Sequence, residues 1–377
     1  MAKKSNSNAY GKLVRVLIVL FVLLAICAAG YIMLDQSIKT QEDENIRLAA
    51  EENARLEEQY QQAKAEEEAE MAQGESEQWP QPKASGWDVV DLTSFPILNP
   101  FSAPVSRQEM LLGGMMLLNH WHAQPQDFPE SELVGVHSVD KAIQVSSSRV
   151  QLFPAAITAL SETIQAAKDA GFEGYIIDEG FRTNETQTAN YQKEEAKYAE
   201  KLNGEALKEK VRQTVNYPGT SEYQSGFSFR IDRYKKGDTE FMSQKFQNMD
   251  MSDWLLAHSW EYGIVFRFPV QGYPNSTVSD KSYKTGESKK LSIYRYVGKG
   301  NAAVMHALDF CMEEYIEYLM AHPHIAVYEN GELKYEIVRT PGGDAIGMDA
   351  NVQISGSAKD YSVSMDNCGG LITVMSY

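Results

Sequence analysis

The sequence lacks an excess of basic residues and is poor in cysteine. It carries 52 acidic and 35 basic side chains, a formal net charge of -17. Nucleic-acid phosphates would be repelled rather than neutralised, which excludes nucleic acid as a partner. The three cysteines fit neither a metal motif nor a disulfide framework, and Cys27 lies in an apolar run. Cys311 and Cys368 could bridge in an oxidising exterior or lie buried as free thiols.

Apolar residues are abundant enough for a folded protein. The chain has 377 residues, of which 43 % are hydrophobic, so the composition excludes a wholly disordered protein. Because single domains usually contain roughly 100 to 200 residues, we predict one large domain with attached segments.

The first attached segment is an uncharged apolar run of 19 residues at 16–34. At about 1.5 Å per residue it can cross the roughly 30 Å hydrocarbon layer, so we predict a single transmembrane helix. Basic residues in 1–15 precede the run and mostly acidic residues follow it, which predicts a cytoplasmic N-terminus and an extracellular main domain. A cleaved signal peptide, or a lipoprotein signal ending at Cys27, fits less well because the apolar run continues past its small residues.

A polar segment at 35–86 separates this run from the main domain. Up to about residue 78 it is rich in Glu, Gln and Ala and has no proline, a composition that favours helix but offers little surface to bury. Ala49, Leu56 and Ala63 lie seven residues apart, so a short coiled coil with weak self-association is one interpretation. A solvated helical stalk is the simpler one, and the prolines of 79–86 mark the linker that ends it.

The rest of the chain mixes helix and strand patterns. Apolar spacing predicts helices at 153–170, 193–215, 251–262 and 302–320, and a short strand at 175–177. Alternating residues around Asn330-Gly331 predict a β-hairpin, followed by further strands. We therefore predict an α+β domain at 87–324 and a β-rich C-terminal extension at 325–377.

Several segments within roughly 116–315 resemble the VanY-type D-alanyl-D-alanine carboxypeptidases, zinc enzymes that trim peptidoglycan stem peptides. EGFRTNETQ (179–187) is similar to the family's S-G-Y-R-S-x-x-x-Q, and PGTSEYQSGFSFRI (218–231) to P-G-x-S-E-H-Q-T-G-x-A-x-D-I. WLLAHSWEYGIVFRFP (254–269) and TGESKKLSIYRYVG (285–298) resemble W-L-x-x-N-A-x-x-Y-G-F-x-x-R-Y-P and T-G-I-x-Y-E-P-W-H-F-R-Y-V-G, and MLLNHWHAQPQDF (116–128) resembles the opening strand and proline loop. The resemblance implies a small antiparallel sheet with flanking helices, the LAS-type peptidase core.

The same register shows that the family's metal ligands are replaced. Tyr223 stands in the slot of the first zinc histidine, Arg230 in that of the aspartate, and Ile293 in that of the last histidine. Lys290 stands where the family has its general-base glutamate, so neither zinc nor an activated water is implied. Asp232 cannot substitute for the aspartate, because two residues along a strand span about 6.6 Å. We predict no catalytic residue, no metal and no cofactor.

These observations predict a membrane-anchored, non-catalytic module that binds a peptidoglycan stem peptide or another anionic wall component. The resemblance implies Arg182, Gln187 and Ser221 as the retained peptide contacts. Arg230 and Lys290 would add two positive charges and turn the former zinc pocket into an anion pocket. The alternatives are a closed, salt-bridged pocket without function, an active carboxypeptidase with an unusual site, and a purely structural envelope protein.

The apolar run generates a prediction about location. We expect a reporter fused after Glu51 to be exported, and the full chain to stay with membranes after high-salt and alkaline washing, because an uncleaved span holds it. Membrane fractionation with immunoblotting measures both. A soluble form that begins near Gly30 would show instead that the run is a cleaved signal.

Overall fold

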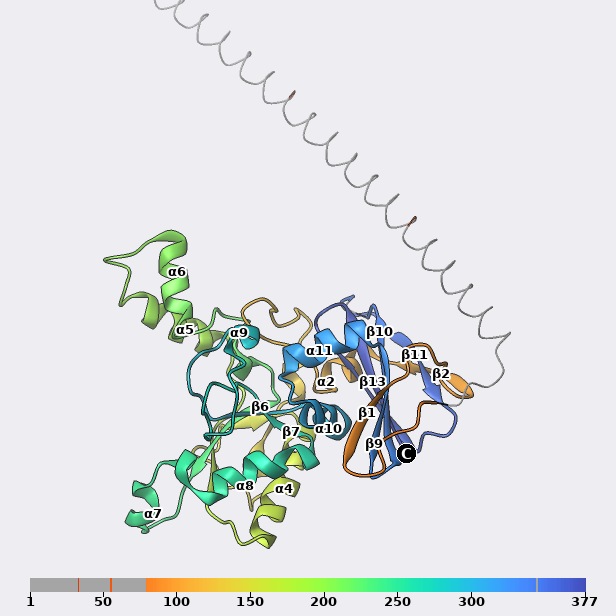
Figure 1. The fold of residues 1–377 in the computed structure, drawn as a ribbon. Helices are drawn as coiled ribbons and strands as arrows, with labels where there is room; N and C mark the ends of the chain where they lie inside the picture. The colour runs from red at the N-terminus through yellow and green to blue at the C-terminus, as the bar shows by residue number, and fades with distance from the viewer. Residues whose placement is uncertain (1–32, 34–54, 56–78, 344) are drawn as a thin grey trace, which may run out of the picture. The chain divides into compact units, whose positions relative to one another are not determined.

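The computed structural model describes residues 33, 55, 79–343 and 345–377 (Figure 1). The chain divides into two compact units, Met1–Glu77 and Gln78–Tyr377, and the second contains nearly all the described residues. Apart from residues 33 and 55, the predicted transmembrane helix and stalk lie outside the described part. Among the described residues, no helix has both the length and the apolar character that a bilayer span requires.

A four-stranded antiparallel sheet forms the centre of one half of the second unit. Its strands are, in order, β5 (Tyr175–Glu179), β6 (Ser228–Arg233), β8 (Ile293–Tyr296) and β7 (Ile264–Phe266). Helices α4 (Pro154–Asp169) and α8 (Asp250–His258) pack with this sheet around one hydrophobic core. Proline at the first position of α4 suits a helix start, because its missing N–H would have no partner there. The predicted α+β class, with a small antiparallel sheet and flanking helices, is confirmed.

A second, five-stranded antiparallel sheet forms the other half. Its strands are, in order, β1 (Trp87–Asp91), β9 (His324–Glu329), β10 (Glu332–Pro341), β13 (Gly370–Ser376) and β12 (Asp360–Met365). Helices α10 (Lys299–Leu308) and α11 (Met312–Ala321) share its apolar core, to which Tyr315 and Ile337 contribute fully buried side chains. Both faces of this sheet are buried, because alternate residues of β13 serve two cores: Ile372 and Val374 belong to this one, and Leu371 and Met375 belong to a second core on the opposite face.

The C-terminal strands are joined to the beginning of the unit. β1 pairs with β9 with Trp87 opposite Glu329, and β2 (Pro100–Val105) pairs with β11 (Ala350–Ser355). The predicted boundary between 324 and 325 falls inside β9. The stretch predicted as a β-rich extension therefore shares its sheet with the first strand of the segment that precedes it.

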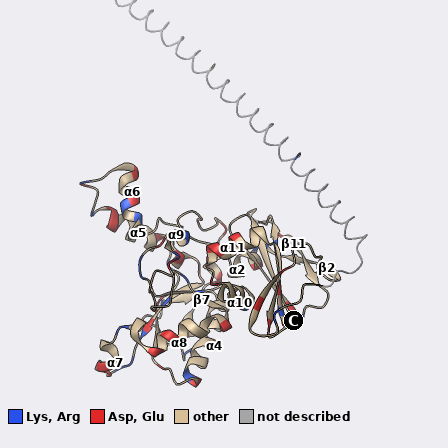
Figure 2. Ribbon diagram, viewed as in Figure 1, with Lys and Arg blue, Asp and Glu red and all other residues tan. Residues whose placement is uncertain are grey.

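Shorter elements connect these layers. They are α2 (Arg107–Leu112), η1 (Glu130–Glu132), β3 (Val134–Gly135), α3 (Val136–Val139), β4 (Gln151–Leu152), α5 (Asn184–Glu195), α6 (Gly204–Arg212), η2 (Glu222–Gln224), α7 (Thr239–Ser243), η3 (Phe246–Asn248), η4 (Ser259–Tyr262) and α9 (Ser282–Thr285). Of these elements, α6 carries acidic and basic positions side by side (Figure 2).

Two of the predicted helices are each divided in the structure. The helix predicted at 193–215 is replaced by the end of α5 and by α6, because the chain between them passes through Asn203, whose extended backbone (φ -143°, ψ 170°) interrupts a helix. The helix predicted at 302–320 is divided into α10 and α11, since Asp309 adopts a left-handed conformation with a φ of 52° and ends α10. Both predictions were wrong about continuity and right about helical character.

The segment 116–128 is not the strand that the resemblance implied. Asn119 and His122 form an isolated bridge around a tight turn, and the Asn119 side chain accepts hydrogen bonds from the backbone N–H groups of Trp121 and His122. This side-chain-stabilised turn takes the place of strand pairing.

Two local predictions concern Asn330-Gly331 and Cys311. Asn330 and Gly331 have φ values of 53° and 82° between β9 and β10, as a two-residue hairpin turn requires, so the predicted hairpin is confirmed. Cys311 is a buried thiol at the N-terminal cap of α11, and burial raises its pKa to about 12.

Candidate ligand-binding site

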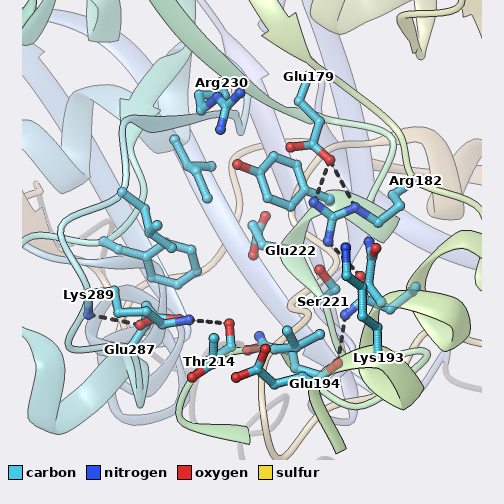
Figure 3. A pocket seen from close by; sticks show the side chains of 18 of the residues that line it. Glu179, Arg182, Lys193, Glu194, Thr214, Ser221, Glu222, Arg230, Glu287 and Lys289 are labelled. Carbon is cyan, nitrogen blue, oxygen red and sulfur yellow. Dashed lines mark hydrogen bonds and ion pairs between the residues drawn. The ribbon is translucent and has the colours of Figure 1, made fainter. Parts of the chain in front are cut away.

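A cavity of about 380 Å³ opens beside the end of β5 (Figure 3). Its walls come from β5, α5, the turn at η2, β6 and the segment 287–293. Gly180 lets the chain pass close to β4 after β5, because a Cβ there would lie 2.6 Å from the Gln151 carbonyl oxygen. The backbone N–H of Arg182 then donates to the Tyr223 carbonyl at 2.8 Å, which joins the two segments that carry most of the predicted site.

Arg182 is held in a fixed orientation inside this cavity. Its Nε donates to Glu179 Oε1 at 2.9 Å, a second guanidinium nitrogen donates to the same oxygen, and Nη1 donates to Gln187 Oε1 at 2.6 Å. The guanidinium carbon lies 4.4 Å from the centre of the Tyr223 ring. Gln187 is itself fixed, since its Nε2 donates to the Asn216 carbonyl at 2.6 Å. An arginine with this many contacts keeps one geometry whether or not a ligand is present.

The turn at η2 places Ser221, Glu222 and Tyr223 in the cavity wall. Gly219 precedes it with a φ of 87°, and its N–H donates to the side chain of Gln224 at 2.8 Å, which closes the turn. Burial raises the pKa of the Tyr223 hydroxyl, and the nearby Glu179 carboxylate adds to this effect. Tyr223 therefore presents a protonated phenol at neutral pH.

Beneath the cavity, Glu222 lies at the centre of a buried ionic network. The residue is 3 % exposed, and its two oxygens accept from Arg267 Nε at 2.9 Å and from Arg295 Nη1 at 2.5 Å. Arg267 also donates to both oxygens of Glu313, at 3.0 and 2.8 Å. Two guanidinium groups thus face two carboxylates, so that no charge of this network is left buried without a partner.

The network also sets the charge state of Glu222. Burial alone would raise its pKa, but Arg267 and Arg295 outweigh burial and hold the pKa below its ordinary value of 4.5. Glu222 is consequently ionised at neutral pH and a weak base. Both arginines stand inside the motifs quoted above, but the sequence pattern does not show that they pair with Glu222.

The structure brings most of the predicted site residues together. The residues that line this one cavity are Arg182, Gln187, Ser221, Tyr223, Arg230 and Ile293. Arg230, on β6, is exposed, with 45 % of its side chain accessible, and lies 3.4 Å from a carboxylate oxygen of Asp178. Asp232, the residue considered as a substitute metal ligand, instead pairs with Arg233 at 2.6 Å.

Lys290 is the predicted site residue that does not line the cavity. It is exposed, and its Nζ lies 6.0 Å from the centre of the Tyr273 ring. Lys289 lines the cavity in its place, since its Nζ donates to the Thr214 carbonyl at 2.6 Å and its N–H to Glu287 at 2.8 Å. Figure 3 shows Lys289 and Arg230 at opposite edges of the cavity. The two cations predicted to line the cavity were Arg230 and Lys290. The structure corrects this prediction, because Arg230 and Lys289 line it instead.

The charged groups that line the cavity are largely paired with one another. Besides the Arg182–Glu179 and Arg230–Asp178 pairs, Lys289 lies 3.5 Å from Glu287, and Lys197 pairs with Glu194. A ligand that carries a charge would have to compete with these pairs, which weakens its binding relative to that in a cavity with free cations.

The donor set of the cavity does not fit zinc. Zinc takes three or four nitrogen, sulfur or carboxylate ligands within about 2 Å. Here the three slots hold a protonated phenol, a guanidinium cation and an isoleucine, and none of these is a zinc ligand in that state. Within the described ranges, 79–343 and 345–377, no three His, Cys, Asp or Glu side chains come together as a metal site.

Comparisons with known proteins agree on one family. The family model described as VanY, D-alanyl-D-alanine carboxypeptidase, matches residues 149–283. A D-alanyl-D-alanine carboxypeptidase of Enterococcus faecium is 25 % identical over 274 residues, which cover 72 % of this chain and 78 % of that protein. The bifunctional D-Ala-D-Ala dipeptidase and carboxypeptidase VanXYC of Enterococcus gallinarum is 29 % identical over 144 residues, 38 % of this chain and 66 % of that one.

A solved structure supports the fold. The vancomycin resistance D,D-dipeptidase VanXYg, in complex with a D-Ala-D-Ala phosphinate analog, superposes with a TM-score of 0.55 at 20 % identity. The superposition covers 74 % of this chain and 99 % of that one. At this identity the likeness concerns the fold alone.

The buried network generates a prediction about stability. Glu222→Gln leaves Arg267 and Arg295 without a matching carboxylate, and we expect it to lower the free energy of unfolding by about 3–5 kcal/mol. Urea unfolding of the full chain measures this. Glu209→Gln is the matched control, because Glu209 pairs with Arg212 at the surface, where solvent screens the pair and it contributes little to stability.

The lowered pKa adds a pH dependence to the same experiment. A carboxylate whose folded pKa lies below its unfolded value stabilises the fold at pH values above the unfolded value, and this contribution is lost as the pH falls through the folded pKa. We expect the parent to lose stability below about pH 4.5 more steeply than Glu222→Gln. If Glu222→Gln and Glu209→Gln were equally stable at neutral pH, Glu222 would not be the centre of a stabilising buried network.

Proposed function

Because the chain belongs to the VanY D-alanyl-D-alanine carboxypeptidase family, we propose that it binds peptidoglycan stem peptides without cleaving them. One observation carries the proposal. A single cavity contains the three polar side chains that the resemblance implies as peptide contacts, together with three ligand slots whose side chains do not bind zinc.

The contacts around Arg182 support binding. A guanidinium with a fixed plane suits a carboxylate, which it can meet with two parallel hydrogen bonds, and the Ser221 hydroxyl can add a third. The relatives support the choice of ligand: one is named a D-alanyl-D-alanine carboxypeptidase, and the solved D,D-dipeptidase holds a D-Ala-D-Ala phosphinate analog. We therefore place the terminal carboxylate of a stem peptide against Arg182 and Ser221.

The charged groups of the cavity support binding without hydrolysis. Cleavage of a peptide bond by water needs a group that takes a proton from the water and a group that stabilises the oxyanion. Arg230 and Lys289 could stabilise negative charge, but as cations they take up no proton. The carboxylates that line the cavity are already paired with cations, and the lowered pKa of Glu222 makes it a poor base.

The anchor predicted at 16–34 would hold this module at the outer face of the membrane. The cell-wall peptides are found in that compartment, so the proposed ligand and the predicted location agree. The alternative, an active carboxypeptidase, requires a set of metal or proton-transfer groups that the described side chains of the cavity do not form.

The first test concerns metal and catalysis. We expect the full chain, purified without chelators and then incubated with zinc, to hold less than one equivalent of metal and to release no D-alanine from a stem pentapeptide. Elemental mass spectrometry and a D-alanine assay measure the two quantities. The variant Tyr223→His, Arg230→Asp, Ile293→His restores donors to the three slots and serves as the loading control. One tightly held equivalent in the parent, with chelator-sensitive release of D-alanine, would overturn the proposal.

The second test concerns the Glu179–Arg182 pair. Glu179→Gln removes the carboxylate that occupies Arg182 and keeps the size of the side chain. Because a hydrogen bond to a charged group contributes about 1.5–3 kcal/mol, we expect at least about a tenfold gain in affinity for a stem pentapeptide with a free terminal carboxylate. Calorimetric titration of the full chain measures it.

The controls for this test separate the pair from general charge. Glu287→Gln removes a negative charge from the opposite edge of the cavity and should change the affinity less. The same peptide with an amidated C-terminus should gain nothing from Glu179→Gln. Equal affinities of the parent and Glu179→Gln for the free peptide would show that Arg182 does not contact the carboxylate.

A further inference from the structure

A second cavity has a volume of about 520 Å³, and some of the residues that line it are close in sequence to residues of the first cavity. Its wall contains Trp121 and His122 from the turn after Asn119, Tyr283 and Lys284 from α9, and several residues of α11. The segment 283–287 contributes to both cavities, because Glu287 lines the first one. Neither the family resemblance nor the proposed peptide site assigns a role to these residues.

Two aromatic side chains of this cavity are exposed to solvent and yet held in place. Trp121 is 59 % exposed and Tyr283 is 68 % exposed. The Trp121 indole lies directly over Gly286, where a Cβ would come within 3.0 Å of the ring. The Tyr283 hydroxyl donates to Glu314 at 3.0 Å. Exposed aromatic groups with a fixed orientation are typical of binding sites, since their apolar faces remain available to a ligand.

Fixed polar groups lie between these rings. The Asn119 amide donates to Glu313 at 3.0 Å, so its oxygen faces His122 and accepts from Nδ1 of the imidazole at 2.8 Å. This tautomer leaves Nε2 of His122 as an acceptor. Lys284 pairs with Glu317, and the pair still offers N–H donors from the ammonium group and acceptor oxygens from the carboxylate.

The charges of this cavity cancel. Glu313 is bonded to Arg267, and Lys284 is paired with Glu317. Burial lowers the pKa of His122, which is therefore uncharged at neutral pH. A charged ligand would gain little here. A purely apolar ligand would leave the fixed polar groups without water or a partner, which is costly.

We propose that this second cavity binds an uncharged saccharide. A sugar ring has an apolar C–H face, which would pack against Trp121 and Tyr283, and hydroxyl groups, which would bond to His122, Lys284 and Glu317. The cavity offers aromatic faces and fixed polar groups together. A sugar can contact both, whereas a charged ligand or a purely apolar ligand cannot.

The choice of a wall saccharide as the probe rests on the proposed function, because stem peptides in the cell wall are attached to glycan strands. The chemistry of the cavity does not depend on it. The trimer of N-acetylglucosamine carries no peptide, so a titration with it tests the saccharide site separately from the proposed peptide site.

The test is a calorimetric titration of the full chain with this trimer. We expect measurable binding to the parent, and about a tenfold loss in Tyr283→Ala and in Trp121→Ala, because each removes an aromatic contact. Tyr283→Phe keeps the ring and should retain the affinity even though it loses the bond to Glu314. Phe101→Ala is the control, since Phe101 is 50 % exposed on β2 and should not affect binding.

The outcomes separate the possible occupants. No binding of the trimer to the parent, or equal binding to the parent and Tyr283→Ala, would overturn the saccharide site. Should Trp121→Ala unfold, the Tyr283→Ala and Tyr283→Phe pair still decides. A peptide without sugar should bind parent and Tyr283→Ala equally. Trimer binding without peptide binding would support this inference and refute the proposed function, and the reverse result would do the opposite.

Discussion

The buried charge of Glu222 is the constraint on which the site region depends. A carboxylate removed from water needs cations and hydrogen-bond donors within reach, and Arg267 and Arg295 supply them from the ends of two strands. Arg295 also donates to the Gly114 carbonyl at 2.7 Å, while Arg267 reaches Glu313 on α11. The buried network around this one charge thus connects the turn at η2 with β8, with the residue after β7, with α11 and with the segment that contains Gly114.

Periodicity predicted the parts of the fold where one pattern continues over many residues. The helix at 153–170 and the hairpin at Asn330-Gly331 are of this kind, and α4 and the β9–β10 turn agree with them. The helix at 302–320 failed as one element because the left-handed conformation of Asp309 interrupts a pattern that continues on both sides of it. The strand at 116–128 failed because the Asn119 side chain bonds the backbone of its own turn. Single-residue conformations and side-chain caps do not show in a spacing pattern.

The site was predictable where a motif sets the register, both on the strands and in the loop that carries Arg182. Arg230 and Ile293 face each other on paired strands, and the register of β6 and β8 fixes both. The prediction failed in the loop before β8, where no period decides which side chain turns inward. Lys289 enters the cavity because the Thr214 carbonyl accepts a hydrogen bond from its side chain, and Thr214 lies 75 residues away in the sequence, so that only the fold brings the two together.

The same ion pairs stiffen both cavities. Glu222 lines the first cavity and Glu313 lines the second, and Arg267 is bonded to both carboxylates. Because the two walls share a buried guanidinium, neither can shift without breaking charge-assisted hydrogen bonds in a region that excludes water. A ligand in either cavity therefore meets groups that are already ordered, which lowers the entropic cost of binding. The buried network of Glu222, Arg267, Arg295 and Glu313 therefore holds polar groups of both cavity walls in position.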